Sequence, residues 1–287
     1  WEHDACGTGF VAHISGAATH QLVLTALEAL AHLTHRGAQD ADAATGDGAG
    51  ILTQLPRALL QAELAAQGIA IAHPDDLAVG MIFLPSLERA PQAHNASQQI
   101  IESVCRAVGV PILTWRAPPI DVTALGTRAQ DSAPTIAQIV LLRPSNLTPQ
   151  QFEHTLYRAR RLIEQRLHAG ADSSLPSCED CYIASLSSMT IVYKGLLSAS
   201  DLPCFYRDLA DPRYASAFAI FHQRYSTNTF PSWPLAQPMR LLAHNGEINT
   251  IQGNRQWMQA REGALFSAQW DRPPQGGPLH VAAPLVG

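Results

Sequence analysis

Apolar residues along the chain follow two spacings, one typical of helices and one typical of buried strands. From Leu22 to Leu33 they recur every three or four residues, which predicts an amphipathic helix that stops at Gly37. A capping box at residues 148–151, with proline at the first helical position, predicts a second long helix. Further helices are predicted over residues 56–67, 95–108 and 250–262.

Short apolar runs between turn residues predict strands. They lie at residues 6–15, 49–55, 77–85, 112–118, 134–144, 218–227 and 240–246, with a hairpin or strand pair over 182–197. The stretch 117–134 is rich in turn-forming residues and is expected to be a loop. Because strands and helices mix without a regular β–α–β rhythm, their order favours an α+β fold over a doubly wound parallel sheet.

Composition and charge narrow the class of protein. The 287 residues are 46% apolar and carry a net charge of −5 without a basic stripe, which argues against a nucleic-acid partner. No apolar run approaches the roughly 20 residues that cross a bilayer, so no membrane segment is expected. Five irregularly spaced cysteines argue against a disulfide framework and favour a reducing, cytoplasmic compartment.

The stretch AHNGEINT has two interpretations. Asn-Gly between apolar residues is a strong signal for a type I′ hairpin turn. Alternatively, Asn245 presents a side-chain amide beside Gly246, whose backbone N–H a ligand can approach closely. Two such donors that converge on one oxygen suit the oxyanion of a tetrahedral intermediate.

Two further segments place polar side chains beside turns or strand ends. In FHQRYSTNT, Arg224 and Thr227 follow an apolar strand, where a guanidinium can clamp a carboxylate. The alternative is an ordinary solvated strand end. In HRGAQDADAATGDGAG, Arg36 and Asp47 lie near glycines, but no phosphate-binding motif is present. A helix stop followed by a turn accounts for that segment.

The cysteines show no shared pattern. A lone C-x-x-C at residues 178–181 lacks the second pair or the spaced histidines of a zinc site, although a metal protein centred on it stays an alternative. Cys105 and Cys204 are expected to be packing residues. Cys6, at the head of a predicted strand, is by itself one more apolar residue.

In chain order, the segments CGTGF, HRGA, GDGAG, HQRYSTNT and AHNGEINT resemble the class II glutamine amidotransferases. The stretch PSWPLAQPMRLLAHNGEINTIQGNRQW is most similar to the glutaminase domain at the front of the glutamate synthase large subunit. Other class II members share its Asn-Gly core but not these flanks. The resemblance runs from Cys6 to about Glu262 and is weakest over residues 85–180. It implies the four-layer αββα sandwich of N-terminal nucleophile hydrolases.

The resemblance gives Cys6 a role. Members use an N-terminal cysteine freed by removal of a leader, so residues 1–5 are expected to be a leader remnant that is cut after Ala5. A thiol is mostly protonated at neutral pH, and a free α-amino group with a pKa of about 7.7 to 8.0 can take its proton. While Ala5 is attached, that nitrogen is an amide, so the chain is expected to be a precursor.

The resemblance also implies the remaining site residues. The oxyanion would be held by Asn245 and Gly246, the glutamine α-carboxylate by Arg224 with Thr227, and the nucleophile segment would be supported by Arg36. Members bind the substrate amino group through an aspartate. Asp271 does not match that motif, so this residue is expected beyond Gly287, and residues 6–287 would be a glutaminase domain truncated at its C-terminal end.

The implied activity is hydrolysis of L-glutamine to glutamate and ammonia through a Cys6 thioester. The ammonia would serve the reductive amination of 2-oxoglutarate in a synthase domain that follows. FMN and an iron–sulfur cluster are implied for the full-length protein, with an electron-donor subunit or ferredoxin as partner, and no cofactor or metal for these residues. The alternatives are another class II amidotransferase, or a catalytically inactive regulatory or assembly domain of the same fold.

Overall fold

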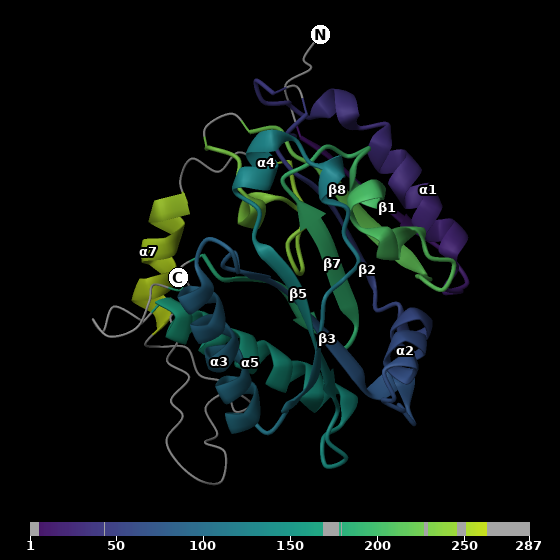
Figure 1. The fold of residues 1–287 in the computed structure, drawn as a ribbon, viewed down its shortest axis with the longest axis vertical. Helices are drawn as coiled ribbons and strands as arrows, with labels where there is room; N and C mark the ends of the chain where they lie inside the picture. The colour runs from purple at the N-terminus through teal and green to yellow at the C-terminus, as the bar shows by residue number, and fades with distance from the viewer. Residues whose placement is uncertain are drawn as a thin grey trace.

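Two antiparallel four-stranded sheets, with helices packed against both, make up the protein (Figure 1). The structure is a computed structural model that describes residues 6–42, 44–168, 178, 180–226, 229–245 and 251–262. The arrangement confirms the predicted α+β class. Within those ranges, no helix has the length and apolar character needed to cross a membrane.

The first sheet joins the start of the chain to a strand near residue 220. Its strands, in spatial order, are β1 (Gly7–Ala12), β8 (Phe218–Gln223), β2 (Ala49–Gln54) and β7 (Thr190–Gly195). All neighbours run antiparallel, and their register aligns Thr8, His222, Gly50 and Lys194 in one row. Because residues directly opposite in an antiparallel pair face the same side, this row lies on one face of the sheet.

The second sheet is buried on both faces. Its strands, in spatial order, are β4 (Ile112–Arg116), β5 (Thr135–Leu142), β3 (Leu77–Leu84) and β6 (Tyr182–Ser187). The central strand β3 is apolar throughout, as expected of a strand covered on two sides. One core receives Val79, Met81 and Phe83, and the other receives Ala78, Ile82 and Leu84.

The helices divide between these two cores. Helix α1 (His20–Ala31) is capped by Thr19 and lies along β1 and β8, and α2 (Arg57–Ala66) joins the same core (Figure 1). Helices α3 (Pro91–Ala107) and α5 (Pro149–His168) pack together over the second sheet. The remaining helices are α4 (Thr127–Asp131), α6 (Leu202–Phe205) and α7 (Ile251–Glu262), with 3-10 helices at Thr34–Arg36, Pro74–Asp76, Val122–Ala124, Arg207–Ala210 and Trp233–Leu235.

Most predicted elements form, and the differences have local causes. The capping box is confirmed, because the Gln151 and Thr148 side chains accept from each other's backbone N–H groups at 2.9 and 3.2 Å, respectively. Both strands predicted over 182–197 form, but they are not paired as a hairpin, because β6 and β7 belong to different sheets, which they link. The helix predicted from residue 95 begins earlier, at Pro91, and the predicted loop 117–134 contains two short helices.

The strand predicted over residues 240–246 is wrong for its described part. Residues 240–245 form no strand. The backbone N–H and carbonyl of His244 bond to side chains instead of to a neighbouring strand. An apolar run alone could not reveal that side chains from elsewhere would satisfy this backbone.

A buried ionic cluster connects the second sheet to the first. The guanidinium of Arg116 on β4 donates to both oxygens of Asp208 at 2.7 and 2.8 Å. The Tyr193 hydroxyl of β7 donates to the same carboxylate at 2.7 Å. Burial alone would lower the pKa of Arg116, but its hydrogen bonds to Asp208 and Glu63 outweigh burial and raise that pKa. The guanidinium therefore stays charged and paired in the interior.

We predict that Asp208→Asn lowers the free energy of unfolding by about 3–5 kcal/mol, because it leaves the buried Arg116 charge uncompensated. The matched control is Arg207→Gln, which breaks the exposed Arg207–Asp121 pair (2.7 Å) and should cost about 1 kcal/mol or less. Denaturant titration of both variants measures the difference. Equal losses in the two variants would contradict a special role for the buried pair.

Candidate active site

Cys6 lies directly before β1, at the end of the first sheet, and is half-buried. Its Sγ accepts a hydrogen bond from the Tyr225 backbone N–H at 3.2 Å and lies 3.4 Å from the Tyr225 carbonyl oxygen, to which the thiol can donate. β1 and β8 pair from Gly7 opposite Gln223 onward, so one further step in register places Cys6 opposite Arg224. Strand pairing therefore brings the candidate nucleophile to the segment that follows β8.

The second glycine of the CGTGF motif allows this pairing. Gly9 lies opposite Phe221, and a Cβ at Gly9 would stand 2.6 Å from two atoms of the Phe221 ring. A separation that short is a steric clash, so a larger residue would push β1 away from β8. The motif thus has a packing reason that is independent of any chemistry at Cys6.

Arg224 lies in a buried polar cluster at the end of β8. Its guanidinium donates to Thr229 Oγ1 at 2.7 Å and approaches the Asp47 carbonyl at 3.5 Å, while the Asp47 carboxylate accepts from the Ser226 N–H at 2.5 Å. Burial lowers the pKa of Arg224, and the neighbouring charges of Asp47 and Cys6 oppose that shift. A guanidinium in this position is suited to an anionic ligand beside the Cys6 thiol.

Asp47 supports the segment after β8. Burial raises the pKa of its carboxyl group, while the Ser226 N–H and the Arg224 charge act in the opposite direction. The Gly48 carbonyl also accepts the Arg224 backbone N–H at 2.8 Å, which ties the segment that carries Asp47 to the residue after β8. Gly37 ends the short helix Thr34–Arg36 and a turn follows at residues 41–42, as predicted, while the segment that carries Asp47 shapes the surroundings of Arg224.

Arg36 lies in the short helix Thr34–Arg36 that follows α1. Its backbone N–H donates to the Leu33 carbonyl at 2.7 Å, and the Leu33 side chain lies against Gly7, 3.0 Å from where a Cβ would stand. The structure thus places the turn that carries Arg36 beside the residue after Cys6. That position suits a residue that supports the nucleophile segment.

Asn245 is exposed and follows a firmly held residue. The His244 carbonyl accepts hydrogen bonds from His222 Nε2 at 2.9 Å and from Gln237 Nε2 at 3.1 Å. Burial lowers the pKa of His222 to about 4, against the opposing hydrogen bonds with the His244 carbonyl and the Asn245 side chain. His222 is therefore neutral near pH 7, and the proton on Nε2 is the one donated to His244.

His244, the residue before Asn245, bonds His222 on the sheet face that extends toward Cys6. His222 lies opposite Thr8, two residues after Cys6, and Arg224 lies two residues after His222. Side chains two apart on a strand point to one side, so this face presents His222 and Arg224 together and extends toward Cys6. Ala5, Thr227 and Gly246, also named from the sequence, lie outside the described residues, as do Glu247 and Asp271.

Two residues of this site were not singled out from the sequence. Thr229 accepts a hydrogen bond from the Arg224 guanidinium. Gln237 is 7% exposed, and its side chain bonds the His244 backbone. Gln237 lies within PSWPLAQPMRLLAHNG, the stretch with the most specific resemblance. The only sequence signal for Gln237 was that it is a polar residue in an otherwise apolar, proline-rich run. Residue spacing could not identify His244 as its hydrogen-bond partner.

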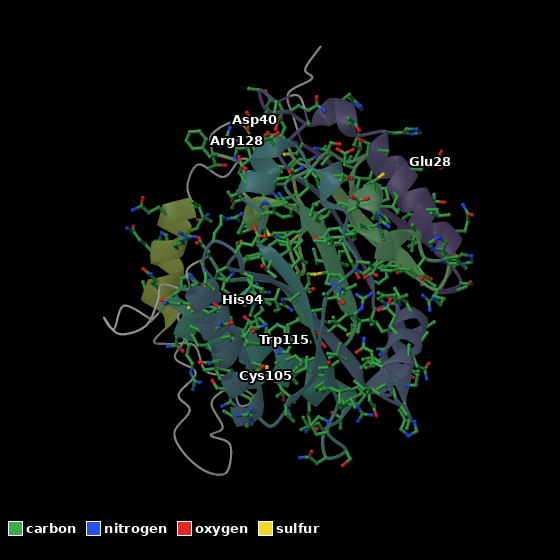
Figure 2. All side chains as sticks on the ribbon, in the orientation of Figure 1. Glu28, Asp40, His94, Cys105, Trp115 and Arg128 are labelled. Carbon is green, nitrogen blue, oxygen red and sulfur yellow. The ribbon has the colours of Figure 1, made fainter. Side chains whose placement is uncertain are left out.

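The other cysteines lie outside the strands of the first sheet. Cys178 and Cys181 are buried, and burial raises the pKa of the Cys181 thiol to about 12. Cys105 is fully buried in α3 and confirmed as a packing residue (Figure 2), whereas the packing interpretation is wrong for Cys204, which is exposed. In the portion of the chain that is described, no cluster of His, Cys, Asp and Glu could hold a metal ion.

Comparison with known proteins points to one family. The Ferredoxin-dependent glutamate synthase 2 of Synechocystis sp. is 43% identical over 285 residues, which cover 99% of this chain and 17% of that protein. The NADPH glutamate synthase large chains of Azospirillum brasilense and Bacillus subtilis are also 43% identical, over 286 and 268 residues, or 18% and 17% of their lengths. This chain therefore spans less than a fifth of each relative.

The sequence profile of the class II glutamine amidotransferases matches residues 6–280, beginning at Cys6. The two antiparallel sheets with helices packed against them agree with the α+β sandwich of the N-terminal nucleophile hydrolases. Since the profile covers nearly the whole chain, the protein belongs to the class II glutamine amidotransferases.

Proposed function

We propose that this chain hydrolyses L-glutamine to glutamate and ammonia, with Cys6 as nucleophile. The observation that carries the proposal is the position of the Cys6 thiol, which lies at the end of the first sheet beside the buried guanidinium of Arg224. The anchored Asn245 extends from the same sheet face. A thiol, a cation for a carboxylate and an amide donor are the groups that hydrolysis of an amino-acid side-chain amide requires.

Removal of the residues before Cys6 would create the catalytic base. The freed α-amino group takes the proton of the Cys6 thiol, and the thiolate attacks the side-chain amide carbon of glutamine. The tetrahedral intermediate carries its negative charge on oxygen, where the Asn245 amide and the Gly246 N–H donate. As the carbon–nitrogen bond breaks, the ammonium of Cys6 returns a proton to the leaving ammonia. Water then hydrolyses the thioester, which releases glutamate and restores the thiol.

Arg224 would bind the α-carboxylate of glutamine, with help from Thr227. Arg224 is 9% exposed and donates to Thr229 and toward the Asp47 carbonyl, with the charge of the Asp47 carboxylate nearby. A carboxylate that reaches such a group forms a charge-assisted hydrogen bond in a weakly screened setting. This would orient the substrate so that its side-chain amide, rather than its carboxylate, faces Cys6.

In the full-length protein, the ammonia would be used for reductive amination of 2-oxoglutarate in a following synthase domain. The support is the 43% identity with glutamate synthases of ferredoxin and NADPH type. FMN, an iron–sulfur cluster and a ferredoxin or electron-donor subunit would belong to other parts of that protein. Among the described residues, Cys178 and Cys181 have no further His, Cys, Asp or Glu grouped with them, so they lack the four ligands of an iron–sulfur site. We propose a cytoplasmic location.

The activity of this site distinguishes the proposal from two alternative functions. Another class II amidotransferase would share the hydrolysis but pass ammonia to a different acceptor. An inactive regulatory or assembly domain would lack glutaminase activity altogether. The retention of Cys6 beside Arg224, with Asn245 anchored on the same sheet, favours an active domain.

The first prediction concerns the nucleophile. In protein expressed from its own gene, the mature chain should begin at Cys6, as intact-mass measurement would show. A glutamine-like diazoketone should label Cys6 and abolish activity, and Cys6→Ser should be inactive. The matched control is Cys204→Ser, which removes an exposed thiol and should leave activity and labelling intact. An active enzyme with an uncut leader, or label on Cys178 or Cys181, would refute the assignment.

The second prediction concerns the oxyanion. Asn245→Ala should lower kcat for glutamine hydrolysis by about 10²–10³-fold with little change in KM, because the lost donor acts mainly in the transition state. Asn254→Ala changes an exposed asparagine on α7 and should keep wild-type kinetics. Steady-state ammonia release measures both. A large rise in KM with unchanged kcat for Asn245→Ala would assign this residue to substrate binding instead.

The third prediction concerns the carboxylate. Arg224→Lys keeps the charge but loses the forked geometry, so KM for glutamine should rise about tenfold or more while kcat falls less. Arg213→Lys, at an exposed arginine paired with Asp211, should change neither constant. The control substrate is a glutamine derivative whose α-carboxylate is replaced by an amide. If Arg224→Lys lowers kcat/KM for this derivative by the same factor as for glutamine, the proposed contact is wrong.

A further inference from the structure

The segment from Trp233 to Asn245 is held to the sheets by side chains from several strands. The Trp233 ring is 3% exposed and meets Phe83 of β3 edge to face, with centroids 5.9 Å apart. From there the segment passes the row of paired residues in the first sheet that contains Lys194, Gly50 and His222. Its last residue is Asn245. This 233–245 segment forms no strand, so its backbone conformation depends on these anchors.

Lys194 anchors the first part of the 233–245 segment. Its side chain is fully buried, and its ammonium donates to the carbonyls of Pro234 and Ala236, both at 2.8 Å. The Tyr182 hydroxyl lies 3.1 Å from the same nitrogen, and the Tyr182 ring centroid lies 4.6 Å away. Because burying an ammonium is costly unless its donors are satisfied, these carbonyls are held firmly in place.

Gln237 anchors the last part of the segment. Its side-chain amide bonds both backbone groups of His244, accepting from the N–H at 2.9 Å and donating to the carbonyl at 3.1 Å. The backbone of Gln237 itself lies close to β2, since a Cβ at Gly50 would stand 2.6 Å from the Gln237 carbonyl oxygen. Gln237 is thus a bridge between the sheet and the residue before Asn245.

These contacts fix the peptide that leads into Asn245. The His244 carbonyl belongs to the peptide group shared with Asn245, and two side chains donate to it, Gln237 and the neutral His222. A peptide plane held at its carbonyl by two donors cannot rotate without breaking both bonds. The position of Asn245 relative to the sheet, and so to Cys6, therefore depends on Gln237.

We propose that Gln237 is a positioning residue for catalysis, which holds the Asn245 amide where the oxyanion forms. The inference rests on the proposed glutaminase function. Gln237 does not contact substrate in this scheme, and its contribution passes through the His244 peptide to Asn245. Displacement of a catalytic donor by about 1 Å can lower a rate by about 10²-fold, so loss of this anchor should affect turnover strongly.

The test uses Gln237→Met, which keeps the length of the side chain but loses both hydrogen bonds. In the protein expressed from its own gene, kcat for glutamine should fall about tenfold or more while KM changes less than about twofold. Alkylation of Cys6 by iodoacetamide, which forms no oxyanion, should keep its wild-type rate. Gln237→Glu keeps the acceptor for the His244 N–H but sets a second oxygen against the His244 carbonyl, so it should also lower kcat, and it provides a second readout if the methionine variant unfolds.

A double-mutant comparison separates positioning from general structure. If Gln237 acts through Asn245, then Gln237→Met combined with Asn245→Ala should be no slower than Asn245→Ala alone. The matched control is Gln54→Met, whose side chain likewise bonds a backbone N–H, that of Ala217 at 2.7 Å, in another part of the sheet. It should leave kcat unchanged.

The outcomes distinguish failure of the positioning role of Gln237 from failure of the proposed glutaminase function. An unchanged kcat in Gln237→Met, additive losses in the double variant, or slowed alkylation of Cys6 would overturn the positioning role while the glutaminase function stands. A wild-type protein without glutaminase activity, or full activity in Cys6→Ser, would overturn the proposed function and this inference with it.

Discussion

The antiparallel pairing of β1 with β8 is the constraint on which the candidate site depends. It joins residues more than 200 positions apart, since the Cys6 thiol meets the Tyr225 backbone across a separation of 219 residues. Closing so long a loop costs conformational entropy, which the buried sheet and α1 must offset. The small residue at Gly9 lets the two strands approach. Any change that shifts this register by one residue would turn the side chain of Cys6 to the opposite face of the sheet.

The fold could be predicted well where local signals were strong. The capping box at 148–151 locates a helix start, and the apolar run at 77–85 locates a strand that is buried on two faces. Spacing could not tell that β6 and β7 would separate into two sheets, because both strands have the same apolar pattern. That separation depends on packing between distant segments.

The candidate site was predictable in its residue types but not in its supports. Cys6, Arg224 and Asn245 stand in motifs whose resemblance can be recognised, whereas Gln237 is a single amide in an apolar run. Its role becomes visible only when the His244 backbone is seen to lack a strand partner. Hydrogen bonds from side chain to backbone across a fold carry no periodic signal, so the apolar stretch before Asn245 was interpreted as a strand.

The absence of a strand at residues 240–245 has a chemical consequence. In a β-ladder or a hairpin turn, successive backbone N–H groups are used in regular pairs, which leaves few of them to point at a ligand. Here the side-chain anchors act on His244, one residue before Asn245, and satisfy its peptide groups without a neighbouring strand. An oxyanion site needs donors that are rigid before the charge forms and yet are not already used within the protein. Anchoring the preceding residue by buried, neutral side chains supplies the rigidity, and the low pKa of His222, about 4, keeps its donor unchanged across the physiological range.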